Sequence, residues 1–370
     1  MSLFSTLPLD PAHTSLWTKL ATQPYPAVPH GLGISEGVWQ ATLHPLSVAA
    51  VSVVYIFAVH HANHKRLRNG PARDLVKETY GLSSAVLAHN AFLCIYSLWT
   101  AQSMIRHLAH YFAQGTAAGG AAGWTAAFCS VPMHAPESHT PHLAPLGLIA
   151  WLFYLSKGYE VVDSIILVLK GKKVSNLQSY HHAGAMWTMW AGVRYSATPI
   201  QLFASWNAIV HTAMYFFYSL TCLKLKVPRA AKQLLTTMQI TQLVLGWCVA
   251  MSYLVVTYRP SAFPDMALPS TGMPAGLASS FSRNSSTPFV KDSLFSLSPY
   301  HTDAASVRSA LASAAEANNG RVPCVGSTGA VFAVYLNLLY LLPLIVLFVR
   351  FYLRSYFGWT PKRDAAKKAQ

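Results

Sequence analysis

The chain has 370 residues, of which 53% are hydrophobic and only 11% are charged, whereas about 25% of the residues of an ordinary soluble domain are charged. This composition excludes a disordered protein and argues against a cytosolic one. The 27 lysines and arginines outnumber the 12 acidic residues, which gives a formal net charge of +15. In so apolar a chain, this excess indicates cytosol-facing loops of a membrane protein rather than a nucleic-acid groove.

The predicted elements begin after a proline-containing N-terminal segment without the apolar core of a signal peptide. We therefore expect an internal helix to direct membrane insertion. Stretches of about 20 largely apolar residues, enough for a helix to cross a bilayer, recur along the chain. They predict seven transmembrane helices at about 38–59, 80–104, 144–169, 180–195, 199–221, 234–257 and 329–352. The fourth of these windows is short.

Basic residues gather between these windows rather than being spread evenly. Of the 27 lysines and arginines, 18 lie in the four segments 60–77, 170–173, 222–232 and 350–370. By the positive-inside rule these segments face the cytosol, so the N-terminus is luminal and the C-terminus is cytosolic. This orientation requires an odd number of spans, which seven helices satisfy.

The chain divides into five parts: a luminal segment (1–37), helices 1–6 (38–257), a long luminal loop (258–328), helix 7 (329–353) and a cytosolic tail (354–370). The loop is rich in Ser, Pro and Ala, which predicts partial disorder. It contains the sequon Asn284-Ser285-Ser286, a candidate glycosylation site. Cys129 and Cys324 would face the same oxidising compartment, either as a disulfide or as two free thiols.

Two carboxylates, Glu160 and Asp163, fall well inside a predicted span, and Lys157 precedes them by one turn. Ionised groups in hydrocarbon are costly, so such residues face the interior of a bundle and by default have a function. The spacing of three residues predicts that all three share one helix face. They could form an ion cluster that only joins helices, or they could orient a histidine.

Polar residues also recur at helical spacing in the next three helices. The sets are Gln178, His181 and His182, then Asn207, His211, Tyr215 and Tyr218, then Thr236, Gln239 and Gln242. A lone buried histidine is usually structural, whereas four polar stripes around one axis predict a polar chamber. A water-filled transport path would produce a similar pattern. A desolvated imidazole that stays neutral would be a nucleophile in such a chamber.

These segments resemble the motifs of the ELO family of very-long-chain fatty acid elongases, which are seven-helix condensing enzymes of the endoplasmic reticulum. The matching segments are KGYEVVDS (157–164) for K-x-x-E-x-x-D-[ST], QSYHH (178–182) for H-x-x-H-H, NAIVHTAMYFFY (207–218) for N-x-x-x-H-x-x-M-Y-x-x-Y and TTMQITQ (236–242) for T-x-x-Q-x-x-Q. Their order and spacing match as well, over about residues 45–257 and the last helix. The resemblance implies an all-α integral membrane fold in which helices 2–7 form a closed, barrel-like six-helix bundle around an acyl-chain tunnel.

Two features depart from the family: position 178 is Gln where most members have His, and the 258–328 loop is unusually long. An amide is neither a general base nor a nucleophile, so Gln178 could only position a neighbour. The nucleophile is then His181, His182 or His211. The resemblance implies His181, with His211 facing it, and we expect Glu160 or Asp163 to orient His182. Because Gln recurs here in some family members that act on polyunsaturated chains, that preference is suggested.

The reaction implied by the resemblance condenses an acyl-CoA with malonyl-CoA through an acyl-imidazole on His181. It yields a 3-ketoacyl-CoA, CO2 and CoA, and requires no cofactor. A ketoacyl reductase, a dehydratase and an enoyl reductase would complete the cycle, and a homodimer would be compatible. The residues expected to bind substrate are Asn207, Tyr215, Tyr218, Thr236, Gln239 and Gln242, with Lys170, Lys172 and Lys173 available for CoA phosphates. Those lysines could equally be topology determinants.

The C-terminal residues Lys367-Lys368-Ala369-Gln370 resemble a di-lysine retrieval signal, which favours the endoplasmic reticulum membrane. Two other classes of protein are also compatible with parts of this sequence. A membrane di-iron desaturase or hydroxylase also uses histidine boxes, but the amide of Gln178 removes a ligand. A seven-helix transporter or receptor also fits the odd number of spans. However, the sequence shows no inverted repeat of the kind found in many transporters, and a receptor has no evident need for so many ionisable groups directed into its interior.

Overall fold

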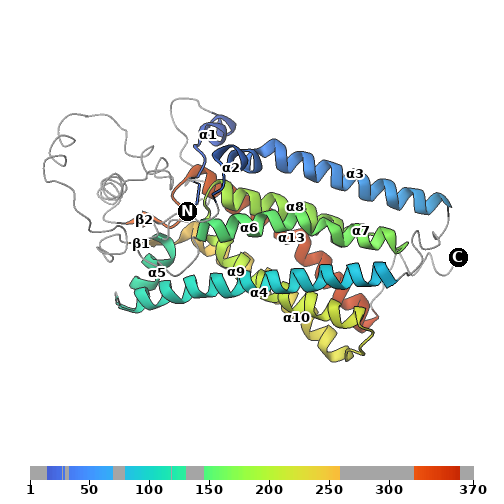
Figure 1. Ribbon diagram of the computed structural model, residues 1–370. Helices are drawn as coiled ribbons and strands as arrows, with labels where there is room; N and C mark the ends of the chain where they lie inside the picture. Colours follow the sequence, from blue (N-terminus) through green and yellow to red (C-terminus); the bar gives the residue numbers. More distant parts are fainter. Residues whose placement is uncertain are drawn as a thin grey trace, which may run out of the picture.

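The computed structural model describes residues 15–26, 28–29, 33–69, 80–117, 119–130, 146–258 and 321–358. The predicted sequon at Asn284, nearly all of the predicted luminal loop, and the basic tail after residue 358 lie outside these residues. Figure 1 shows the described helices as an elongated bundle, with α3 along one edge.

The described secondary structure is mostly helical. The helices are α1 (Leu16–Thr22), α2 (Glu36–Leu43), α3 (Pro45–Asn69), α4 (Tyr80–Ala117), α5 (Ala121–Ser130), α6 (Leu146–Tyr159), α7 (Val161–Leu169), α8 (Asn176–Arg194), α9 (Thr198–Cys222), α10 (Arg229–Val255) and α13 (Thr328–Phe357). Two short strands, β1 (Thr257–Tyr258) and β2 (Val322–Pro323), pair in antiparallel fashion.

Each predicted span corresponds to helical structure, but several ends differ. The first window falls on α2 and α3, the second on the longer α4, and the third on α6 and α7. The fourth is α8, which has 19 residues and begins at Asn176. The helix thus begins about four residues before the predicted window, because Ser175 caps α8 by accepting a hydrogen bond from the Gln178 backbone N–H. The last three windows correspond to α9, α10 and α13.

Four of the described helices are long and apolar enough to cross a membrane: α3, α4, α10 and α13. Taken one at a time, α6 and α7 are too short to cross a membrane, since they have 14 and 9 residues. α8 and α9 are long enough, but the polar residues of their motifs lower their mean hydropathy. The chain is therefore a mostly helical, multi-pass membrane protein.

The helices of the bundle pack in defined neighbouring pairs. α4 packs along α9, α9 against α10, α10 against α13, α13 against α8, α8 against α6, and α6 against α4. α3 packs on α8 and α7, and its apolar side chains Val53, Val54 and Phe57 are exposed. Exposed apolar residues on a helix of this length are what a lipid-facing surface requires.

One end of the bundle is closed by covalent and polar contacts. Cys129 of α5 and Cys324, which follows β2, form a disulfide with a Cα–Cα distance of 4.7 Å; of the two alternatives left open above, the structure has the bridge. At the same end, buried Arg194 of α8 donates a 2.8 Å hydrogen bond to the carbonyl of Pro24 and stacks on Tyr25. These contacts hold the N-terminal segment against the bundle.

The opposite end carries those parts of the predicted cytosolic segments that the structure describes. The ends of α3, α7 and α13, the start of α4 and the connection between α9 and α10 all lie there (Figure 1). Lys172, Lys173, Lys224, Lys226 and Lys232 are exposed. The described basic residues of these segments are thus gathered at one end of the molecule.

Candidate active site

The interior of the bundle contains a buried ion pair on α6 and the α6–α7 junction. The Lys157 Nζ lies 2.6 Å from the Glu160 Oε1, and both residues are only 2% exposed. Lys157 also donates a 3.3 Å hydrogen bond to the Asn207 Oδ1 on α9. Because burying two charges costs more than a surface pair would, this pair is a candidate for function rather than for stability alone.

Three imidazoles lie beside this pair. The His211 Nδ1 is 3.5 Å from the Glu160 Oε1. The ring of His181 is 5.6 Å from that of His182 and 6.3 Å from that of His211, measured between centroids. His181 therefore lies next to both other histidines, and the resemblance-based expectation that His211 faces it agrees with this geometry.

The second carboxylate of the predicted face, that of Asp163, binds elsewhere. Both oxygens of Asp163 accept hydrogen bonds, one from His89 Nε2 on α4 at 2.9 Å and one from the Tyr215 hydroxyl on α9 at 2.8 Å. The other ring nitrogen of His89 lies 3.3 Å from the Tyr159 hydroxyl. The predicted common face is interrupted because α6 ends at Tyr159 and α7 begins at Val161.

The expectation that Glu160 or Asp163 orients His182 was therefore wrong. Glu160 contacts Lys157 and His211, and Asp163 is bound to His89 and Tyr215. Among the described residues, the buried His182 Nδ1 has no hydrogen-bond partner. The ring of His182 instead meets that of Tyr55 edge-on at 6.1 Å between centroids.

The side-chain amide of Gln178 acts as a hydrogen-bond donor. Its Nε2 donates a 3.1 Å hydrogen bond to the Ser164 Oγ, which lies 2.9 Å from the Tyr55 hydroxyl. Gln178 lies in the first turn of α8, one turn before His181. It thus links α8 to α7 and, through Ser164, to α3.

The predicted substrate-binding residues divide into two groups. Asn207 and Tyr215 belong to the buried cluster, and Tyr218 contacts Tyr215 edge-on while being 40% exposed. On α10, Gln239 bonds to Met214 at 3.5 Å, Thr236 lies 3.3 Å from the Tyr356 hydroxyl, and the buried Gln242 Oε1 has no partner among the described residues. No contact of these three with the imidazoles is seen in the described residues. Of the predicted phosphate partners, Lys172 and Lys173 are exposed and Lys170 is half-buried.

Two residues of this site were missed by the sequence analysis. One is His89, which forms a polar pair with Asn90 inside an apolar window, and that signal could have revealed it. Tyr340 on α13, whose hydroxyl lies 2.8 Å from the His181 Nδ1, has no such signal, because a tyrosine in an apolar helix also suits the membrane interface.

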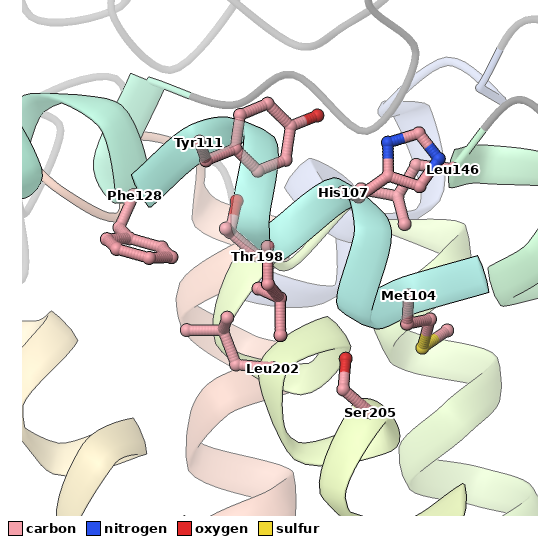
Figure 2. Close-up of a pocket in the computed structure, with 9 residues that line it drawn as sticks. Met104, His107, Tyr111, Phe128, Leu146, Thr198, Leu202 and Ser205 are labelled. Atoms are coloured by element: carbon pink, nitrogen blue, oxygen red, sulfur yellow. The ribbon is translucent and has the colours of Figure 1, made fainter. Parts of the chain in front are cut away.

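A pocket lies nearer the disulfide end of the bundle. Figure 2 shows this pocket, which is lined by residues of α4, α5, α6 and α9, including Met104, His107, Leu202 and Ser205. Ser205 precedes His211 by six residues on α9, which corresponds to about 9 Å along a helix. The pocket therefore lies along the same helix pair, α4 and α9, that carries His89 and His211.

The fold and the site together define a multi-pass helical membrane protein with ionisable and imidazole side chains in its interior. The sequence profile of the GNS1/SUR4 family (ELO) matches residues 40–368. The chain belongs to this family, and the matched region contains all four motifs.

Curated relatives agree with this assignment. The chain is 26% identical over 212 residues to very long chain fatty acid elongase 7 of Rattus norvegicus, a match covering 56% of this chain and 68% of the relative. It is 32% identical over 150 residues to long chain fatty acid elongase 2 of Caenorhabditis elegans, covering 40% and 51%. It is 33% identical over 123 residues to fatty acid elongase 2 of Trypanosoma brucei brucei, covering 33% and 45%. The chain thus spans only about half the length of the latter two. Family and relatives support fatty acid elongation.

Proposed function

We propose that the chain condenses an acyl-CoA with malonyl-CoA to give a 3-ketoacyl-CoA, CO2 and CoA. The observation that supports this most directly is the group formed by half-buried His181 with buried His211 and the buried Lys157–Glu160 pair. Desolvated imidazoles beside fixed charges can act as nucleophile and as proton-transfer group. The unpartnered His182 Nδ1 and Glu160 Oε2 are buried polar atoms that a substrate could satisfy.

In the first half-reaction, the Nε2 of neutral His181 attacks the thioester carbonyl, the C–S bond breaks and CoA leaves as a thiolate. The acyl-imidazolium that forms carries the positive charge. In the second, malonyl-CoA loses CO2, and the resulting enolate attacks the acyl carbonyl and releases neutral His181. The thiolate takes a proton from solvent, which balances the overall reaction.

The proposed chamber is a closed ring of six elements in the order α4, α9, α10, α13, α8 and α6–α7, with α3 outside as a seventh span. The neighbouring pairs that pack together support this order. An acyl-imidazole hydrolyses in water, so the chamber must exclude it. Arg194 and the Cys129–Cys324 bridge would keep the far end shut.

The acyl chain would run from His181 past His211 toward the pocket of Figure 2. The CoA phosphates would stay at the basic end, where Lys172, Lys173, Lys224 and Lys226 are exposed. We place that end in the cytosol and the disulfide end in the lumen of the endoplasmic reticulum, since thiols oxidise there and basic loops stay outside it. The reductases and dehydratase of the cycle and a second copy of the chain are proposed partners.

The experiment uses the purified full chain and labelled malonyl-CoA with a panel of saturated and polyunsaturated acyl-CoAs. The wild type should form labelled 3-ketoacyl-CoA, and with acyl-CoA alone it should gain the mass of one acyl group on the peptide containing His181. His181→Ala should do neither, and Gln178→His tests whether position 178 sets the preference for unsaturation. Equal labelling by the wild type and His181→Ala would refute the assignment.

A further inference from the structure

Tyr340 contacts His181 twice through one hydroxyl group. The Tyr340 Oη lies 2.8 Å from the His181 Nδ1, and the same hydroxyl donates a 3.2 Å hydrogen bond to the backbone carbonyl of His181. Tyr340 is on α13 and His181 is on α8, 159 positions apart in the chain. Both contacts must therefore be explained with the single proton that a phenol carries.

Counting protons selects one form of the imidazole. A carbonyl oxygen only accepts, so the hydroxyl proton is used in that bond. The contact with Nδ1 is then a hydrogen bond only if Nδ1 carries a proton and donates it to the Oη. In a neutral imidazole with Nδ1–H, the lone pair is on Nε2. The opposite tautomer would leave the carbonyl contact without a proton.

The tyrosine ring is held where this bond requires it. The Tyr340 ring stacks on the Tyr180 ring at 5.6 Å between centroids, a contact that phenylalanine at position 180 would keep. The Tyr180 hydroxyl makes a separate 3.1 Å hydrogen bond to the backbone carbonyl of Tyr340 and does not contact its ring hydroxyl. Gly184, one turn after Tyr180, lies beside the Tyr340 ring. Its lack of a side chain makes room for that ring, since a Cβ at position 184 would lie 2.1 Å from the Tyr340 Cε2. The position of the hydroxyl is thus fixed by packing between α8 and α13.

We propose that Tyr340 is a positioning residue that holds His181 in the Nδ1–H tautomer, so that Nε2 is the atom that attacks the acyl thioester. This inference rests on the function proposed above. As the carbonyl carbon bonds to Nε2, the imidazole becomes positively charged, and its Nδ1–H donates more strongly to the Tyr340 Oη. Tyr340 touches neither substrate nor the reacting atoms in this scheme.

The test compares Tyr340→Phe with Tyr180→Phe. Each substitution keeps its aromatic ring and removes one hydroxyl from the same α8–α13 contact, but only the first removes the partner of His181. We expect Tyr340→Phe to slow acyl-enzyme formation by about tenfold to a hundredfold, by analogy with the loss seen when the hydrogen-bond partner of a metal-binding histidine is removed. The KM for acyl-CoA should stay the same, and Tyr180→Phe should acylate at the wild-type rate.

The readouts separate this inference from the proposed function. Acylation is followed by intact mass in single turnovers, and kcat and KM are measured separately. If the wild type forms no acyl adduct, the proposed function fails; if Tyr340→Phe forms the adduct as fast as the wild type, only the role of Tyr340 fails. Equal slowing by both variants would also overturn it, because it would indicate a structural effect.

A measurement on the unsubstituted protein covers the case in which Tyr340→Phe does not fold. Nitrogen-15 NMR of histidine-labelled wild-type protein, with His181→Ala to assign the signal, reports which ring nitrogen carries the proton. Protonated Nδ1 is expected. A proton on Nε2 in the resting protein would overturn the proposal.

Discussion

At the scale of single residues, the Asp163 carboxylate connects three helices. It lies on α7 and accepts one hydrogen bond from His89 on α4 and one from Tyr215 on α9. Asp163→Asn would place an amide N–H2 opposite one of these donors and would remove the charge from both bonds. Since hydrogen bonds to charged groups contribute about 1.5–3 kcal/mol each, we expect the variant to unfold at a lower temperature and to lose activity.

Thermal unfolding in detergent, followed by circular dichroism, measures this effect. Tyr159→Phe is the matched control, because it removes only the longer 3.3 Å contact to the other nitrogen of His89. Its unfolding temperature should stay close to that of the wild type. If Asp163→Asn melted at the same temperature as this control, the carboxylate would not be holding the three helices together.

The residues of the site were predictable where their signal is local in the chain. Lys157 and Glu160 are three positions apart, and they pair as that spacing predicts. Asp163 has the same spacing but binds other helices, since the helix is interrupted at Glu160. The contact between His181 and Tyr340 depends on how α13 packs against α8, which no pattern within one segment encodes.

At the scale of helices, the close contact of α8 and α13 depends on a residue without a side chain. Gly184→Ala would place a methyl group 2.1 Å from the Tyr340 ring, so the two helices would have to separate. Overpacking of this kind costs about 1–3 kcal/mol. We expect a lower unfolding temperature together with slower acylation of His181, because Tyr340 would move.

Gly37→Ala is the control for this substitution. Gly37 lies within α2, and an added Cβ meets nothing within 4 Å. Alanine is favoured over glycine in a helix by about 0.5–1 kcal/mol, so this variant should be as stable as the wild type or slightly more so. If Gly184→Ala formed the acyl-enzyme at the wild-type rate, this prediction would be contradicted, because α8 and α13 would then accommodate the methyl group without moving Tyr340.

The helices themselves were easier to predict than their ends. Apolar stretches of the length needed to span a bilayer are visible in one sequence, and all seven windows correspond to helical structure. The start of α8 depends on the Ser175 cap, and the division into α6 and α7 on the conformation of one residue, Glu160. Such features involve a few backbone angles and leave little trace in hydropathy.

At the scale of the whole molecule, the Cys129–Cys324 bridge joins parts of the chain that are 195 positions apart. Disulfides that close long loops stabilise proteins by about 2–4 kcal/mol, so Cys324→Ser should unfold at a lower temperature. Cys248→Ser, which removes an exposed free thiol on α10, should have no effect. A gel-mobility shift on reduction of the wild type but not of Cys324→Ser verifies the bridge, and equal unfolding temperatures of all three proteins would contradict its stabilising role.

The concentration of exposed lysines at one end of the molecule leads to a prediction about substrate binding. If the CoA phosphates lie at the basic end, Lys172→Ala and Lys173→Ala should each raise the KM for acyl-CoA. Exposed charge pairs contribute up to about 1 kcal/mol, which corresponds to a factor of about five. Arg321→Ala removes an exposed charge at the disulfide end and should leave the KM unchanged.

Salt distinguishes this electrostatic effect from a change of structure. Interactions between exposed charges are screened within about 3 Å at 1 M salt, against about 10 Å at 0.1 M. Raising the salt concentration should therefore increase the KM of the wild type and remove most of its difference from Lys172→Ala and Lys173→Ala. The kcat should be the same in all these proteins, because the lysines lie far from His181 in the proposed path. A KM for acyl-CoA that responded neither to the lysines nor to salt would mean that the phosphates bind elsewhere.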